Sequence, residues 1–127
     1  SLLGLTSADH VQDFYLRGSL FENFIISEYR KFALHSGQIP KIYFWRDNTG
    51  NEIDLLVDHG AKLNAIEIKS GMTLNPSFFT GLKKFQKFSG ISANNCFLVY
   101  GGDQNISRKD AHVIHWRNLH NLPGFRM

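Results

Sequence analysis

The alternation of apolar and polar positions is clearest in the stretch GNEIDLLVDHGAKLNAIEIKSG, residues 50–71. Two runs rich in apolar residues, at about 52–58 and 62–69, meet at the sequence DHG, which predicts two strands joined by a turn. Charged residues recur two positions apart in each run, and such residues share one face of a strand. Charges on an otherwise buried sheet need compensation, which a divalent cation with its water shell supplies. The two charged pairs are Glu52 with Asp54 and Glu67 with Lys69.

The remaining pattern predicts helices and further strands on both sides of this hairpin. Helices are expected at about residues 7–15, 19–34 and 75–88. Strands are expected at about 41–46, 95–100 and 113–116, the last as a short edge strand. Asn75 and Pro76 supply a cap and a first-turn proline for the third helix. This helix lies between two strands, so it must be a crossover that joins a parallel pair. We expect an α/β fold with a mixed sheet of four to five strands, in the order helix, three-strand meander, crossover helix, strand.

The helix expected at 19–34 carries a carboxylate on its apolar side. Projection at 100° per residue places Glu22 on the arc that faces the core. A carboxylate in that position is costly unless it is paired or bound to a metal. Two interpretations stay open: an ion pair with Arg46 or Arg17, or membership of the same site as the carboxylates of the hairpin. Glu28 lies near the edge of the arc, and we expect it to form a structural ion pair.

The crossover helix has an apolar stripe opposite a basic face. The basic face consists of Lys83, Lys84 and Lys87. These lysines either form an ordinary solvated surface or, as the more specific alternative, bind the phosphates of a nucleic acid. Gln86 projects toward the sheet, where it either reaches the active centre or forms a satisfied buried amide.

Composition narrows the class of protein. A chain of 127 residues, of which 43% are hydrophobic, is long enough for one core, so we expect a single domain over residues 1–127. The formal charge of +3 permits an acidic partner without arguing for one. One cysteine, Cys96, excludes a disulfide framework and makes a reducing cytoplasm the default location. The six histidines show no zinc-site spacing. No apolar run approaches the ~20 residues of a membrane span.

The charged residues together resemble a known pattern. A helix glutamate, an aspartate on one strand and E-x-K on the next are similar to the core of the PD-(D/E)XK nuclease superfamily, although the usual proline of that motif is Ile53 here. The segments RGSLFENFIISE, YFWRDNTGNEIDLLV, AIEIKSGMT and F-x(2)-GLKKF resemble the C-terminal domain of unknown function in a large family of prokaryotic P-loop, AAA-type ATPases. The resemblance runs from about residue 2 to 116. It implies a restriction-endonuclease-like fold and an ATPase module that precedes this domain in the parent protein. The chain itself has no G-x(4)-GK[ST] stretch and therefore no nucleotide site of that kind.

The resemblance also assigns roles to individual residues. Asp54 and Glu67 would hold Mg²⁺ or Mn²⁺, ions that prefer carboxylate oxygens, water and phosphate. The backbone carbonyl of Ile68 would be a further ligand, and Glu22 would bind directly or through water. Lys69 would position or help deprotonate the attacking water and stabilise charge at the phosphate.

Two charged neighbours have more than one interpretation. We expect Glu52 and Arg46 to form an ion pair with each other. The alternatives are that Glu52 orients a ligand and that Arg46 binds a phosphate oxygen.

Two main functions follow as expectations. The first is a metal-dependent nuclease acting on DNA, with RNA second. The alternative is a catalytically silent module that binds nucleic acid or a protein partner for the ATPase. A plain interaction domain, with its charges in ion pairs, is the third interpretation. The presence of a lysine beside the carboxylates favours retained chemistry. The sequence leaves the oligomeric state and the kind of DNA open.

Overall fold

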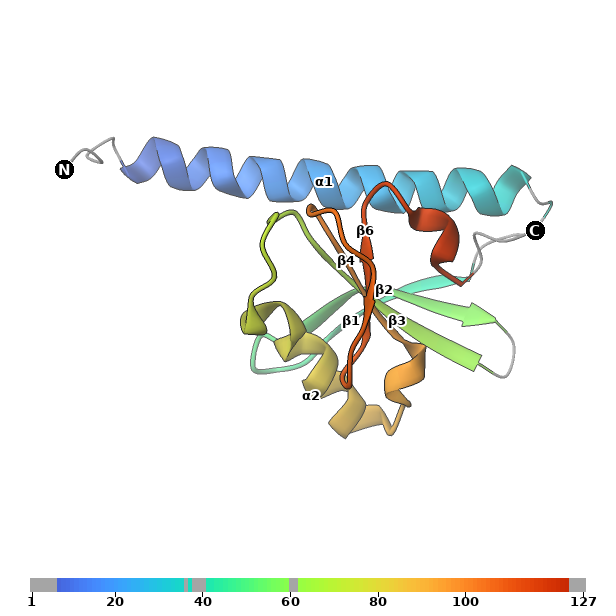
Figure 1. The fold of residues 1–127 in the computed structure, drawn as a ribbon. Coiled ribbons are helices and arrows are strands. Elements are labelled where there is room, and N and C mark those ends of the chain that lie inside the picture. Colours follow the sequence, from blue (N-terminus) through green and yellow to red (C-terminus); the bar gives the residue numbers. More distant parts are fainter. Residues whose placement is uncertain (1–6, 36, 38–40, 60–61, 124–127) are drawn as a thin grey trace.

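Two helices enclose a mixed sheet, one on each face, in three layers (Figure 1). The computed structural model describes residues 7–35, 37, 41–59 and 62–123. The helices are α1 (Ser7–His35) and α2 (Thr80–Ser89). The strands are β1 (Ile42–Arg46), β2 (Glu52–His59), β3 (Lys62–Lys69), β4 (Cys96–Tyr100), β5 (Ile106–Ser107) and β6 (His112–His115). Three short 3-10 turns complete the described part: η1 (Pro76–Phe79), η2 (Ala93–Asn95) and η3 (Leu119–Asn121). No helix in these ranges is long and apolar enough to cross a membrane.

The sheet has six strands in the order β1-β2-β3-β4-β6-β5. The meander β1-β2-β3 is antiparallel, whereas β3 with β4 and β4 with β6 are parallel. The α/β class and the crossover between β3 and β4 are therefore confirmed. The expectation of four to five strands was too narrow. The two-residue strand β5 is too short to show in a sequence pattern, and it pairs with β6, so the strand predicted near 113–116 is not at the edge.

Helix α1 is continuous, so the prediction of two helices separated near Gly18 was wrong. Glycine lowers helix stability by about 1 kcal/mol relative to alanine but does not by itself end a helix. The residues that follow Gly18 pack on the sheet, where Ile25 and Tyr29 are buried. This packing outweighs the weak propensity at one position. The N-terminal part of α1 extends beyond the sheet (Figure 1).

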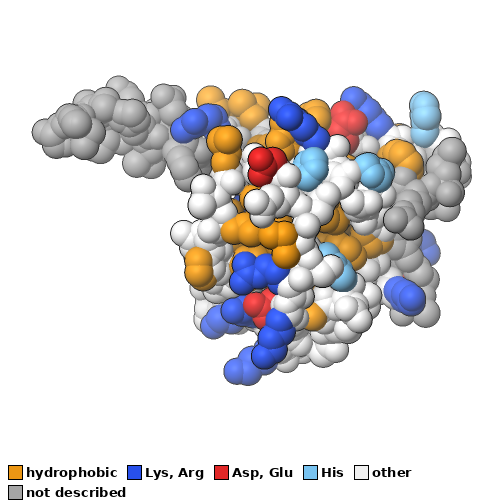
Figure 2. All heavy atoms as spheres, viewed as in Figure 1, with side chains coloured by type: hydrophobic (Ala, Val, Ile, Leu, Met, Phe, Trp, Pro, Cys, Tyr) orange, Lys and Arg blue, Asp and Glu red, His pale blue; other side chains and the backbone are white. Residues whose placement is uncertain are grey.

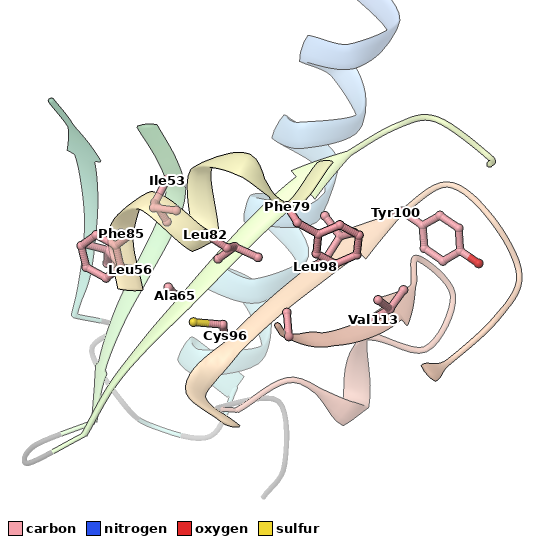
Figure 3. Packing of buried hydrophobic residues seen from close by; sticks show 11 residues of the cluster. Ile53, Leu56, Ala65, Phe79, Leu82, Phe85, Cys96, Leu98, Tyr100 and Val113 are labelled. Atoms are coloured by element: carbon pink, nitrogen blue, oxygen red, sulfur yellow. The ribbon is translucent and has the colours of Figure 1, made fainter. Parts of the chain in front are cut away.

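Each face of the sheet has its own core. On the α1 side, Ile25 and Tyr29 pack on alternate residues of the central strands, including Ile66 and Ile68 of β3. Figure 3 shows the core on the α2 side. It contains Ile53, Leu56, Ala65, Phe79, Leu82, Phe85, Cys96, Leu98, Tyr100, Ala111 and Val113. Burial of each large apolar side chain contributes roughly 1.5–3 kcal/mol, which holds both helices against the sheet.

The capping signals predicted for the crossover helix act on the short element before it. Asn75 accepts a hydrogen bond from the Ser77 amide at 2.9 Å, and Pro76 begins η1, whereas α2 starts at Thr80 without a side-chain cap. Helix α2 then ends at Gly90, which has a φ of 77° and donates its amide to the Gln86 carbonyl at 2.8 Å. The turn predicted at DHG reaches residue 60, which lies outside the described residues, as do residues 1–6 and 124–127 of the expected domain.

Strand β2 contains a β-bulge opposite β1. Between two successive pairs of their ladder, β1 contributes one residue, Phe44, and β2 contributes two, Asp54 and Leu55. The core contacts show the same irregularity, because Ile53 and Leu56 are three positions apart and yet both pack on the α2 side. A bulge redirects side chains and increases the local twist. It places an irregular segment of backbone where the charged residues lie.

Candidate functional site

Two carboxyl groups occupy the place where β2 and β3 separate. The regular ladder between these strands stops at the pair Leu55–Ile66. Beyond it, the Ile68 amide donates to Asp54 Oδ2 at 2.8 Å, and the Asp54 amide donates to Glu67 Oε1 at 3.4 Å. Side-chain oxygens thus replace backbone carbonyls as acceptors. Buried amides left without acceptors are costly, so these carboxyl groups help to hold the sheet together.

The two carboxyl groups reach this gap from different sides of the sheet. Asp54 lines a cavity with Glu22 of α1. Glu67 alternates along β3 with residues of the α1-side core, so its side chain leaves the strand toward α2. A Cβ atom added to Gly81 of α2 would lie 2.8 Å from Glu67 Oε2 and 2.8 Å from the Glu52 carbonyl oxygen. Glycine is therefore what allows α2 to approach Glu67 so closely.

The spacing of charges predicted part of this geometry. Glu52 and Asp54 line the same cavity, as their spacing of two suggests. The shared face within each strand does not extend across the two strands, because Asp54 and Glu67 leave the sheet on opposite sides and meet through the gap between β2 and β3. Two separated strands allow that contact, and a continuous ladder would not.

A cavity of about 520 Å³ opens beside this pair. It is bounded by α1, by the ends of β2 and β3, and by the segment that leads to η1. Among the predicted site residues, its lining includes Glu22, Glu52, Asp54, Ile68 and Lys69. Glu67 is only 4% exposed and is not part of this lining. Ser19 of α1 also lines it, a residue that the sequence did not single out.

Burial and mutual repulsion change the acid–base properties of the site. The pKa of Glu67 is raised well above its ordinary value, first by burial, then by a hydrogen bond with Asp54 and by the negative charge of Asp54, with Lys69 opposing the shift. The pKa of Glu22 is also raised, first by burial and then by the charges of Asp54 and Glu52, again opposed by Lys69. Burial beside Asp54 therefore favours the protonated form of Glu67.

The donor groups suit a hard cation only in part. Among the described residues, no three His, Cys, Asp or Glu side chains are arranged so that they could hold a metal ion. What is in place is the pair Asp54 and Glu67, with Glu22 close enough for its pKa to respond to Asp54. Carboxylate oxygens are the ligands that Mg²⁺ and Mn²⁺ prefer. The pair therefore supplies the kind of oxygen that such an ion binds, and an ion between the two groups would relieve their mutual repulsion.

The neighbouring charges form the ion pairs that were expected. Arg46 Nη2 and Nε donate to Glu52 Oε2 at 3.0 and 3.2 Å. Glu28 pairs with Lys31 at 3.4 Å. Within the described ranges Glu22 forms no ion pair with Arg46 or Arg17, so the structure favours its place in the cavity.

The crossover helix contributes less to the site than the sequence suggested. The Gln86 amide donates to the carbonyl oxygen of Asp110 at 2.8 Å, so it is a satisfied amide directed to the loop before β6 and not to the carboxylates. Lys83 pairs with the side chain of Asp110 at 3.5 Å. Lys84 and Lys87 are exposed. Lys and Arg side chains gather around α2 in the lower part of Figure 2.

Besides Ser19, sequence reasoning missed two residues that shape the site. Gly81 was visible only as a glycine within a helical pattern, which signals close backbone approach but not to which partner. Phe44 was visible as an apolar residue of β1, yet it is 64% exposed and lines a second cavity that also includes Asp54. A periodic pattern assigns such a residue to the core, so its exposure can be found only in three dimensions.

The fold and the site define an α/β domain in which a carboxylate pair and a lysine lie at a split in a mixed sheet. The sequence matches the family described as a domain of unknown function (DUF4143) over residues 17–119. The chain therefore belongs to this family. Comparison with curated proteins gave no match, and comparison with solved structures gave none either.

Proposed function

We propose that this domain is a metal-dependent phosphodiesterase of the PD-(D/E)XK type, with a restriction-endonuclease-like core, that acts on DNA as the partner of an AAA-type ATPase in the same protein. The observation that carries the proposal is the pair Asp54 and Glu67, whose carboxyl groups accept backbone amides where β2 and β3 separate. Lys69 and Glu22 lie in the cavity next to this pair. Perturbed carboxylates at a cavity are the usual setting for acid–base and metal chemistry.

The proposal gives each residue a role. Asp54 and Glu67 would hold Mg²⁺ or Mn²⁺ once Glu67 has lost its proton, with the Ile68 carbonyl and Glu22 as further ligands. The ion, when bound, activates water and neutralises charge on the phosphate. Lys69 places a positive charge in the same cavity, where it orients the attacking water and stabilises the negative charge that develops on the phosphate in the transition state.

The alternative is a module with the same core that binds nucleic acid or a protein partner without cutting. One observation favours it. Both carboxyl groups accept hydrogen bonds from backbone amides, so the fold itself needs them. A pair of carboxyl groups that is needed to stabilise the sheet would be retained in a domain that has no catalytic activity.

Cleavage in the presence of Mn²⁺ distinguishes the two functions. The substrate set is linear and branched DNA, offered to the whole protein with ATP. Lys69→Ala should lower cleavage by ~100-fold or more and leave DNA binding nearly unchanged, because the lysine acts in the transition state. Lys62→Ala is a matched control, since Lys62 is an exposed lysine at the other end of the same strand. DNA bound tightly and never cut would refute the phosphodiesterase and leave the binding module.

A further inference from the structure

A second cavity adjoins the carboxylates on the side of β1. Its volume is about 430 Å³, within the ~300–1,000 Å³ of small-molecule sites. The two cavities have four lining residues in common: Ser19, Glu22, Glu52 and Asp54. Because these residues lie on both linings, the two cavities adjoin each other at Asp54, and we refer to them together as the groove. The end formed by the second cavity includes Phe44, Trp45 and Arg46.

Phe44 presents an aromatic ring to this groove. Phe44 is 64% exposed, although the next residue of the same strand, Trp45, packs against the core on the α2 side. The position follows from the bulge, because Phe44 is the single residue of β1 that faces Asp54 and Leu55 of β2. Phe88 is exposed as well, but its ring rests on Trp45 with centroids 5.5 Å apart, and it lines neither cavity. Phe44 thus combines exposure with a place beside the carboxylates.

Arg46 supplies donors at the same end of the groove. Its guanidinium has five N–H groups. Two of its nitrogens each donate one hydrogen bond to Glu52 Oε2, which fixes the plane of the group. The side chain is 77% exposed, so the remaining donors face solvent. A planar, oriented guanidinium suits a phosphate group.

We propose that the groove binds an unpaired single strand of nucleic acid, with one base stacked on Phe44 and an adjacent phosphate at Arg46. The inference rests on the proposed function and specifies its substrate class. A duplex buries the faces of its bases in its own stack, whereas a single strand presents them to aromatic side chains. The strand continues along the groove past Asp54 and Lys69, which brings the neighbouring phosphodiester to the carboxylates.

Fluorescence anisotropy tests the proposal without requiring cleavage. The probes are labelled strands of about ten nucleotides, a length suited to one groove, as single-stranded DNA, single-stranded RNA and duplex DNA, each with Ca²⁺ in place of Mg²⁺. Phe44→Leu keeps apolar bulk but removes the ring. We expect it to weaken single-strand binding by about 5- to 150-fold, the loss typical of one base stack. Phe88→Leu is the matched control and should bind as the wild type does.

Each outcome bears on the inference. Stronger binding of single strands than of duplex, with a loss confined to Phe44→Leu, supports it, and the DNA and RNA probes show which strand is preferred. Equal binding by both variants, preference for duplex, or no binding at all overturns it. The fluorescence of Trp45, measured in Trp116→Phe, gives a second readout, because a base beside Phe44 should quench it.

The two proposals can fail separately. Single-strand binding that depends on Phe44, without cleavage of any substrate in Mn²⁺, would keep the inference and refute the phosphodiesterase. The opposite result is cleavage of duplex DNA alone, which is lost in Lys69→Ala and unchanged in Phe44→Leu. It would support the phosphodiesterase and refute the inference.

Discussion

Replacing Glu67 by glutamine tests whether this buried carboxyl group carries a proton in the folded, metal-free protein. Glutamine has nearly the same shape and does not titrate. Its oxygen can accept the hydrogen bond from the Asp54 amide, and its NH₂ group can donate to the Asp54 carboxylate in place of the Glu67 proton. The substitution therefore imitates the protonated form of Glu67 and removes its titration.

The sign of the effect follows from proton linkage. Because the pKa of Glu67 is raised on folding, from an ordinary value of 4.5, the folded chain keeps a proton that the unfolded chain has lost. The contribution of Glu67 to stability is fully present below the unfolded pKa and is lost as pH rises toward the folded pKa. The slope is about 1.4 kcal/mol per pH unit, so two units, from pH 6 to pH 8, correspond to about 2.7 kcal/mol.

Urea denaturation at pH 6 and pH 8, in a chelating buffer, measures this difference. Relative to the wild type, Glu67→Gln should gain about 2–3 kcal/mol in free energy of unfolding between the two pH values. Glu22 is present in both proteins, so its own titration largely cancels in the comparison. Glu28→Gln removes a carboxylate from a surface ion pair and should follow the wild type at both pH values. Parallel pH profiles for Glu67→Gln and wild type would refute the raised pKa of Glu67.

Three further outcomes are expected. Gly81→Ala should lower the free energy of unfolding, as measured by the urea midpoint. The new Cβ would lie 2.8 Å from both Glu67 and a backbone carbonyl, and such overpacking costs about 1–3 kcal/mol, whereas the gain in helix propensity is at most about 1 kcal/mol. Mn²⁺ should raise the melting temperature of the wild type by mass action but not that of Asp54→Asn, which keeps an acceptor oxygen; a shift of equal size in both proteins would contradict the assigned site. Joint replacement of Lys84 and Lys87 by alanine should weaken DNA binding and flatten its salt dependence, with cleavage at saturating DNA unchanged; an unaltered salt slope would leave these lysines as a solvated surface.

The elements with a strong local pattern were predictable from sequence. The hairpin β2–β3 follows from its apolar alternation, and the crossover follows from a capped helix between two strands. Two features were not predictable. The continuity of α1 through Gly18 depends on packing against the sheet, and β5 exists because β6 offers it an edge. Both are tertiary effects that no local pattern contains.

For the candidate site, spacing grouped residues that do lie together in the structure, but for an incomplete reason. Asp54 and Glu67 were grouped by assuming a regular ladder, whereas the ladder ends just before them. The bulge that redirects Asp54 depends on the register in which β1 and β2 pair. The sequence of either strand by itself does not determine that register. The ion pair of Arg46 with Glu52 was predictable because the two residues lie at facing ends of adjacent strands.

The hydrogen bonds at the split of the sheet have a consequence for how this domain can evolve. Under the proposed function, Asp54 and Glu67 serve both the folded sheet and the chemistry, and the first role does not depend on the second. A descendant without activity would then still need both carboxyl groups, whereas Lys69 acts on the pair through its charge. We therefore expect a loss of catalysis to be followed by replacement of the lysine sooner than by replacement of either acid.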